Sequence, residues 1–175
     1  MGIKNEVLYY TIVKKDDILF ADGCSMHEKA RYLLKWMLDY LGMEFCDIGI
    51  SDYGKPYFKS GDIRFNYSHS NNYIACAVSF FEVGVDIEDT GRKISDRVSN
   101  RYLDGERDIK KRLEKWVRKE AYGKLKGLGL LIDFSKINLD EVCNKNIFIN
   151  NEHYVCSIYS DYSGVIFKEI KFSEK

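Results

Sequence analysis

A nearly continuous apolar run, Tyr73–Phe81, is followed after a single glutamate by a second one, Val83–Ile87. Apolar runs of this length without helical periodicity are typical of strands that are buried on both faces. The two runs therefore predict consecutive strands, paired with each other through a tight connection. Since the 175-residue chain is 45% hydrophobic and 14% aromatic, it can bury a substantial core around them.

Two other segments have the periodicity of helices. Ser25 and Glu28 form a capping-box pattern ahead of apolar residues at helical spacing, and Gly42 predicts where this helix ends. A second, longer helix is predicted from Glu106 to about residue 126, where Gly127 would end it.

Further strands are predicted where β-branched and aromatic residues concentrate, at residues 7–13, 63–67, 147–149, 154–159 and 165–172. The polar residues 89–105 are predicted to be irregular. The order strand, helix, strands, helix, strands predicts an α+β fold of two similar halves, about 1–88 and 89–175.

One carboxylate interrupts the second apolar run and another directly follows it. Asp86 and Glu88 are two residues apart, so on a strand their side chains share one face, while Val85 and Ile87 point to the other. Carboxylates this close repel each other unless a cation lies between them. Taken alone, the pattern also fits the polar face of an ordinary strand.

The longer predicted helix carries charges on its apolar stripe. That stripe consists of Ile109, Leu113, Trp116, Val117 and Ala121. Glu120 and Lys124 fall within it, and Lys119 lies at its edge, where its ammonium could reach a phosphate. A simple Glu–Lys i,i+4 pair would normally lie on the solvent face instead. Together with Asp86 and Glu88, Glu120 predicts an oxygen-ligand site for Mg²⁺.

The string Phe65–Ser70 places polar groups at the end of a predicted strand. Ser68 and His69 could bind phosphate oxygens there. A hydrolase built on this Ser-His pair is not supported, because the chain has no G-x-S-x-G elbow. His27 and His153 are expected to be surface residues.

The charge is balanced overall but unevenly distributed. With 27 basic and 27 acidic residues the net charge is zero, so a general nucleic-acid binder is not indicated. Residues 91–126 nevertheless hold 13 basic and 6 acidic residues. This segment predicts a local anionic partner, although a solvated helix face has the same composition.

The five cysteines form no C-x-x-C pair, which favours reduced, buried thiols in a cytoplasmic protein and argues against a cysteine-bound metal. The N-terminus lacks the apolar region of a signal peptide. No apolar run approaches the ~18 residues of a membrane span.

Four strings occur in one order: Gly54-Lys55-Pro56, Phe65–Ser70, Val83–Glu88, and Trp116-x-x-Lys119-Glu120-Ala121-x-x-Lys124. In sequence, order and spacing they resemble the 4′-phosphopantetheinyl transferase superfamily, of the monomeric surfactin-synthetase-activating type. The resemblance covers residues 54–130. It implies a monomer of two pseudo-symmetric halves, each a small, mostly antiparallel sheet packed with a long helix, with coenzyme A bound between them.

The resemblance implies Mg²⁺-dependent transfer of the 4′-phosphopantetheine arm of coenzyme A to a serine of an acyl or peptidyl carrier protein, with release of adenosine 3′,5′-bisphosphate. Mn²⁺ could replace Mg²⁺. The implied metal ligands are Asp86, Glu88 and Glu120. The implied contacts with the coenzyme are Arg31, Lys55, Pro56, Ser68, His69, Lys119 and Lys124. Acidic carriers suit the basic segment, and no nucleic acid or membrane partner is expected.

The catalytic base stays open between two glutamates. The family's aromatic-Ser-x-x-Glu string is most similar to Tyr102–Glu106, with Leu103 in the place of Ser. Glu106 or Glu120 could accept the serine proton, although Glu106 also fits a simple acid at a helix N-terminus. Two other functions compete: a Mg²⁺-dependent nuclease or phosphohydrolase, and a non-catalytic homologue that binds coenzyme A or a carrier.

Overall fold

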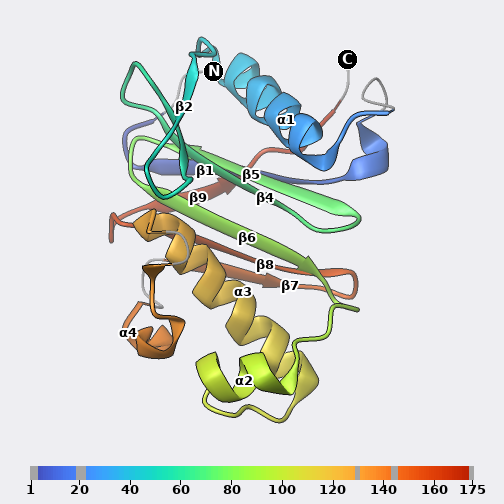
Figure 1. Cartoon of the computed structure of the whole chain (residues 1–175). Helices are drawn as coiled ribbons and strands as arrows, with labels where there is room; N and C mark the ends of the chain where they lie inside the picture. Colours follow the sequence, from blue (N-terminus) through green and yellow to red (C-terminus); the bar gives the residue numbers. More distant parts are fainter. Residues whose placement is uncertain (1–3, 19–22, 129–130, 143–145, 174–175) are drawn as a thin grey trace.

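The protein, seen in a computed structural model, is described over residues 4–18, 23–128, 131–142 and 146–173. Figure 1 shows two sheets between two long helices, with α1 (Met26–Leu41) on one sheet and α3 (Ile109–Lys126) on the other. The predicted α+β class is confirmed.

The first sheet has the strand order β4-β5-β1-β9. Its strands are β1 (Val7–Lys14), β4 (Arg64–His69), β5 (Tyr73–Ser79) and β9 (Ile166–Glu169). β5 pairs antiparallel with β1 and β4, whereas β9 lies parallel to β1. The strands predicted here are confirmed, but β4 is longer than expected and includes Ser68 and His69.

Helix α1 forms as its sequence predicts. The Ser25 hydroxyl accepts a hydrogen bond from the Glu28 N–H at 3.3 Å, and the Glu28 carboxylate accepts one from the Ser25 N–H at 2.8 Å. Gly42 ends the helix with φ 70°, a conformation that glycine adopts without strain. The apolar face of α1 packs on the first sheet, which fixes the position of His27 and Arg31 in its first two turns.

The second sheet has the strand order β6-β8-β7 and is antiparallel throughout. Its strands are β6 (Val83–Asp89), β7 (Asn146–Asn150) and β8 (Tyr154–Ser160). α3 lies unusually close to β6 at Gly84, where an added Cβ would be 2.1 Å from the Ala121 carbonyl oxygen and 2.3 Å from the Leu125 nitrogen. The glycine therefore allows α3 to bring its side chains next to those of β6.

Three expectations about this half are wrong. β6 pairs with β8 and not with β5, because an apolar run indicates burial but does not select a partner strand. Residues 89–105 are not irregular throughout, since Ser95 caps the helix α2 (Asp96–Tyr102). α3 begins at Ile109, capped by Asp108, and Ile109 is 59% exposed instead of lying in the apolar stripe.

The division into halves near residue 89 stays a prediction. The two sheets do not divide at residue 89. β6 ends at this residue but belongs to the second sheet, whereas β9 follows it and extends the first sheet. β4 and β6 are edge strands that lie side by side without forming one sheet. The Asn66 side-chain oxygen accepts a hydrogen bond from the Val85 N–H at 2.9 Å and joins the two edges.

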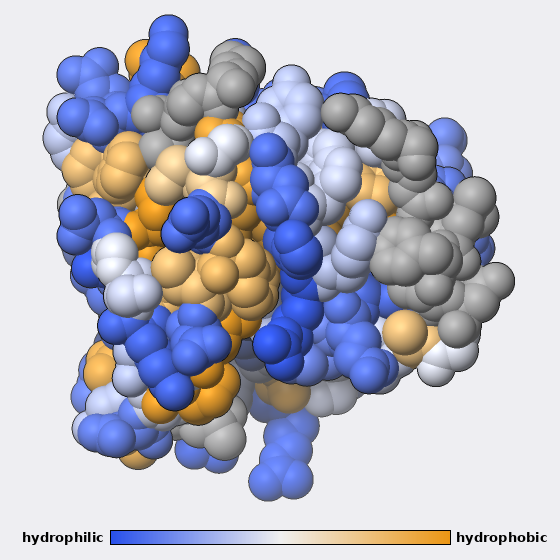
Figure 2. Space-filling model, turned by 90° about the horizontal axis from the view of Figure 1, so that it is seen from above, coloured by the Kyte–Doolittle hydropathy of each residue, from blue (hydrophilic) through white to orange (hydrophobic). Residues whose placement is uncertain are grey.

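The remaining elements are short: η1 (Lys15–Asp17), the hairpin β2 (Ile48–Ile50) and β3 (Pro56–Phe58), η4 (Phe134–Lys136), and α4 (Leu139–Val142). Ile50, Tyr53 and Tyr57 of the hairpin region are exposed. Figure 2, viewed from above, shows hydrophobic surface flanked by hydrophilic residues on this side of the molecule. Within the described residues, no helix has the length and apolar character needed to cross a membrane.

The cysteines only partly match the expected buried thiols. Cys76 and Cys156 are buried in the two sheets, whereas Cys24 is exposed and Cys46 is partly buried. These four are free thiols, and Cys143 lies outside the described residues.

Candidate active site

A hollow of about 310 Å³ lies between the two sheets and α3. It is lined by Tyr67, Ser68, His69, Asp86, Glu88, Arg92, Trp116, Glu120 and Lys124. β4 supplies the first three residues, β6 the two adjacent carboxylates, and α3 the last three. The fold therefore brings together all three carboxylates that the sequence predicted.

Asp86 is the centre of the contacts in this hollow. Its side chain is 6% exposed, and its Oδ1 accepts hydrogen bonds from Lys124 Nζ at 2.6 Å and from Ser68 Oγ at 2.9 Å. Lys124 Nζ also lies 2.9 Å from Ser68 Oγ. Asp86 Oδ2 is buried without a hydrogen-bond partner, and an unpaired buried oxygen of this kind is costly unless a ligand binds it.

The other two carboxylates face the same space. Glu88 forms an ion pair with Arg92, which follows it four residues later in the chain. Burial, and then the negative charge of Asp86, raise the pKa of Glu120, while Lys124 and Arg92 offset part of this effect. Glu120 therefore holds its proton more readily than an exposed glutamate, and a nearby cation would favour its charged form.

The donor set fits a hard divalent cation, because it consists of carboxylate oxygens and includes an unpaired one on Asp86. In the described residues, however, no three His, Cys, Asp or Glu side chains are positioned together to hold a metal ion. Lys124 holds Asp86 and Arg92 holds Glu88 instead. Metal binding would require these side chains to change partners, and the metal assignment stays a prediction.

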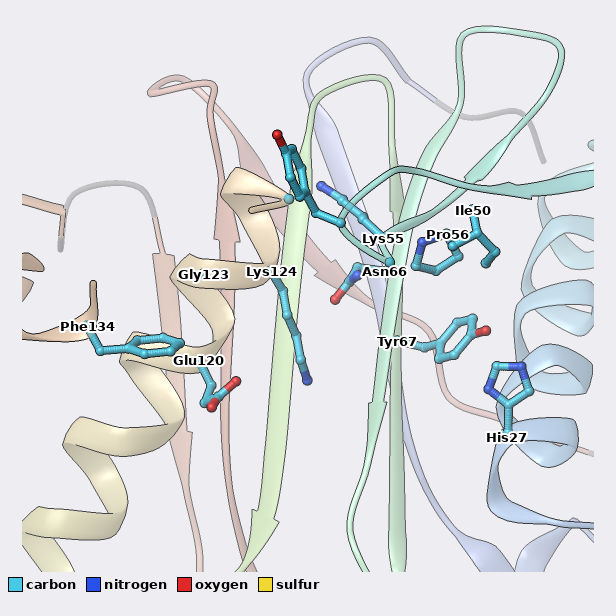
Figure 3. A pocket seen from close by; sticks show the side chains of 13 residues that line it. His27, Ile50, Lys55, Pro56, Asn66, Tyr67, Glu120, Gly123, Lys124 and Phe134 are labelled. Carbon is cyan, nitrogen blue, oxygen red and sulfur yellow. The ribbon is translucent and has the colours of Figure 1, made fainter. Parts of the chain in front are cut away.

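A second pocket of about 360 Å³ adjoins the hollow and shares Tyr67, Glu120 and Lys124 with it. In Figure 3, Glu120 and Lys124 extend from α3 on one side, and Tyr67 and His27 lie on the opposite side. The rings of His27 and Tyr67 meet edge to face with their centroids 5.7 Å apart. The wall is completed by residues of the hairpin region, including Pro56, so the pocket could hold a flat, partly apolar group.

Most predicted coenzyme contacts lie in these two cavities. Ser68 and His69 line the hollow, Lys55 and Pro56 line the second pocket, and Lys124 lines both. Partial burial, followed by the charge of Lys124, lowers the pKa of His69 and favours its neutral imidazole, which donates one hydrogen bond and accepts another.

Four predicted residues are placed differently. Lys119 lies outside both cavities: it is 2% exposed, and its Nζ donates to the carbonyl oxygens of Tyr102 at 2.7 Å and Phe134 at 2.8 Å. Lys55 contributes its stem to the second pocket, while its Nζ pairs with Glu82 at 2.6 Å.

Arg31 is exposed on α1, near Tyr67, and does not line either cavity. Glu106 is also outside both cavities. It pairs with Lys115 at 3.0 Å, and this contact and the N–H groups of Asp108 and Arg107 lower its pKa.

Sequence reasoning missed Arg92 and underestimated His27. Arg92 stands in a polar segment where nothing in the sequence distinguishes it from its basic neighbours. His27 is exposed, as expected, yet it also lines the second pocket; its position one helical turn before Arg31 was the available signal. His153 is exposed and lies away from both cavities.

Comparison with known proteins identifies the family of the chain. Residues 82–166, which run from β6 through α3 to β9, match the family described as the 4′-phosphopantetheinyl transferase superfamily. The chain belongs to this superfamily. The predicted resemblance is thus confirmed.

Three proteins named 4′-phosphopantetheinyl transferases are similar to this superfamily member. It is 30% identical to the gsp protein of Aneurinibacillus migulanus, over 66% of this chain and 58% of that protein. It is 32% identical to a transferase of Bacillus subtilis, over 69% of this chain and 58% of the relative. It is 29% identical to Sfp of Bacillus subtilis strain 168, over 61% and 54% respectively. The chain thus spans little more than half the length of these relatives.

Proposed function

We propose that this superfamily member transfers the 4′-phosphopantetheine arm of coenzyme A to a serine of an acyl or peptidyl carrier protein and releases adenosine 3′,5′-bisphosphate. The observation that carries the proposal is the meeting of Asp86, Glu88, Glu120 and Lys124 in one hollow that adjoins a second pocket. Charged groups of both signs suit a phosphate ester that is held and cleaved through a metal ion.

The residues of the hollow would bind a phosphate in two ways, through hydrogen-bond donors and through a metal ion. Lys124 and Ser68 would donate hydrogen bonds to phosphate oxygens, and the neutral His69 would add a further donor. Asp86, Glu88 and Glu120 would hold Mg²⁺ or Mn²⁺. The bound ion would offset the negative charge that develops on the leaving phosphate.

The structure favours Glu120 over Glu106 as the group that accepts the serine proton. Glu120 lies in the hollow, beside the residues proposed to bind the phosphate, where a carboxylate can reach the incoming serine. Glu106 is paired with Lys115, has a lowered pKa, and lines neither cavity. We infer that Glu120 accepts this proton directly or through a water molecule.

The carrier would dock on the basic segment 91–126. Arg107, Lys110 and Lys111 are exposed around the start of α3, and the exposed Ile109 lies among them. This combination suits an acidic partner that also presents an apolar side chain.

Intact-mass spectrometry of an apo carrier protein tests the proposal. The carrier is incubated with the protein, coenzyme A and Mg²⁺, and a parallel sample contains EDTA. A mass increase of one phosphopantetheine arm that EDTA abolishes would support the transfer and its metal requirement together.

Two other results would replace the proposal. Coenzyme A binding by calorimetry without transfer to any of several carriers would indicate the non-catalytic homologue. Cleavage of nucleic acid in the absence of coenzyme A would indicate the phosphohydrolase.

Docking is tested by the charge-reversed variant Arg107→Glu/Lys110→Glu/Lys111→Glu. We expect a higher KM for an acidic carrier, an effect that added salt reduces, and unchanged coenzyme A binding. The matched control reverses three exposed lysines outside the basic segment, Lys14, Lys59 and Lys168. An unchanged KM for the carrier in the α3 variant would show that docking occurs elsewhere.

A further inference from the structure

Each of the two carboxylates of β6 is paired with a basic side chain of the protein. Lys124 Nζ lies 2.6 Å from Asp86 Oδ1, and the Arg92 guanidinium pairs with Glu88. Lys124 is already a predicted phosphate contact. Arg92 has no such role, although it lines the same hollow and its charge also acts on Glu120.

The turn that leads to Arg92 is anchored through Asp89 and Thr90 to residues of both sheet regions. The Arg92 N–H donates to the Asp89 carbonyl oxygen at 2.9 Å, which closes a tight turn. The Asp89 carboxylate accepts from the Asn71 N–H at 3.0 Å, and the Thr90 N–H donates to the His153 carbonyl oxygen at 3.0 Å. Arg92 therefore extends from an anchored turn at the rim of the hollow.

The side chain of Arg92 is free to reorient from this anchor. It is 46% exposed, whereas that of Glu88 is 12% exposed. A guanidinium stays protonated in proteins, and its planar donors match a carboxylate and a phosphate equally well. A divalent ion on Glu88 would repel the guanidinium and weaken its pairing with this carboxylate, so that the guanidinium could bind an anionic ligand in the same hollow.

We propose that Arg92 exchanges partners when the site is loaded. It holds Glu88 until a divalent cation binds that carboxylate, and its guanidinium then binds a phosphate group of the coenzyme in the same hollow. The proposal rests on the function proposed above. It makes Arg92 a competitor of the metal when the coenzyme is absent and a contact of the coenzyme when the metal is present.

The first measurement is Mn²⁺ binding without coenzyme, followed through the electron paramagnetic resonance signal of free Mn²⁺. We expect Arg92→Gln to bind Mn²⁺ about two- to fivefold more tightly than the natural protein, because one partly exposed ion pair no longer competes. Arg92→Lys keeps the charge and should stay close to the natural value. Arg97→Gln removes an exposed arginine of α2 and serves as the matched control.

The second measurement is coenzyme A binding by calorimetry at saturating Mn²⁺. Here Arg92→Gln should bind about tenfold more weakly, the loss expected for one hydrogen bond between charged groups. Arg92→Lys should recover part of the affinity, and Arg97→Gln should show no change. A merely structural role for Arg92 would not move the two affinities in opposite directions.

The outcomes separate this inference from the proposed function. Equal or weaker Mn²⁺ binding by Arg92→Gln overturns the competition between Arg92 and the metal. Unchanged coenzyme A binding by this variant overturns the phosphate contact. In both cases the proposed function stands if the natural protein binds Mn²⁺ and loads carriers. If the natural protein binds no Mn²⁺ at all, the metal assignment fails, and the exchange fails with it.

Discussion

At the residue scale, the candidate site depends on which charged side chains face the hollow and which are already paired. Asp86 accepts hydrogen bonds from two donors and keeps one unpaired oxygen. Lys119, which was predicted to contact a phosphate of the coenzyme, is instead buried among backbone carbonyls. Two substitutions separate these roles.

Asp86→Ala should reduce carrier loading about 100-fold or more, because it removes a predicted metal ligand and the partner of Lys124. The fold should persist, since Lys124 is 32% exposed and can be hydrated. Initial rates from intact-mass spectrometry and a thermal melt measure the two effects. Near-normal loading by this variant would refute the assignment of Asp86 to the metal.

Lys119→Met should lower the free energy of unfolding by about 1–3 kcal/mol, because the carbonyl oxygens of Tyr102 and Phe134 lose their buried donor. Coenzyme A affinity should stay unchanged. Denaturant unfolding and calorimetry report the two quantities, with the exposed Lys126→Met as control. Weaker coenzyme binding at normal stability would restore the phosphate role predicted from the sequence.

Lys124 and Lys119 show what the sequence can determine about single residues. Helical periodicity correctly placed Glu120 and Lys124 on the side that faces β6. Lys119 is only one residue from Glu120, or about 100° around the helix, so its direction depended on α2 and η4, whose positions the sequence does not reveal. Arg92 was missed for a similar reason, because its role comes from a turn anchored by distant residues.

At the scale of the elements, the distance between α3 and β6 sets the site. The carboxylates of β6 and the charged residues of α3 meet only because Gly84 lets the helix backbone lie directly on the strand. Side chains two residues apart on β6 were predicted correctly to share a face, because strand periodicity is local. Its pairing with β8 was not predicted, because strand partners are chosen by contacts far apart in sequence.

Gly84→Ala should lower the free energy of unfolding by about 1–3 kcal/mol, since the new Cβ would meet backbone atoms of Ala121 and Leu125 that cannot move independently. It should also weaken Mn²⁺ binding by separating Glu120 from Asp86. Gly91→Ala, with open space around its Cβ, is the control. Unchanged stability in the Gly84 variant would mean that α3 can shift on the sheet at little cost.

At the scale of the whole molecule, one buried thiol lies in each sheet, Cys76 on β5 and Cys156 on β8. Burial raises the pKa of both thiols far above their ordinary value of 9.0. The unfolded chain therefore loses these protons first as the pH rises.

This linkage predicts that stability falls in alkali. The contribution of the protonated thiols to the free energy of unfolding is complete below pH 9. Above pH 9 it decreases by up to about 1.4 kcal/mol per pH unit for each thiol. Denaturant unfolding between pH 8 and 10.5 measures the slope, which should be smaller in Cys76→Ala/Cys156→Ala. Equal slopes in the two proteins would contradict the assignment, as would rapid alkylation of Cys76 or Cys156 in the folded state.

The hydrogen bond from the Val85 N–H to the Asn66 side chain has a wider meaning for the architecture. Two exposed sheet edges that lie side by side normally tend to join through their backbones. Here a side-chain amide takes the place of a neighbouring strand and stops the ladder between β4 and β6. The interruption keeps the seam open, and both candidate cavities lie along that seam.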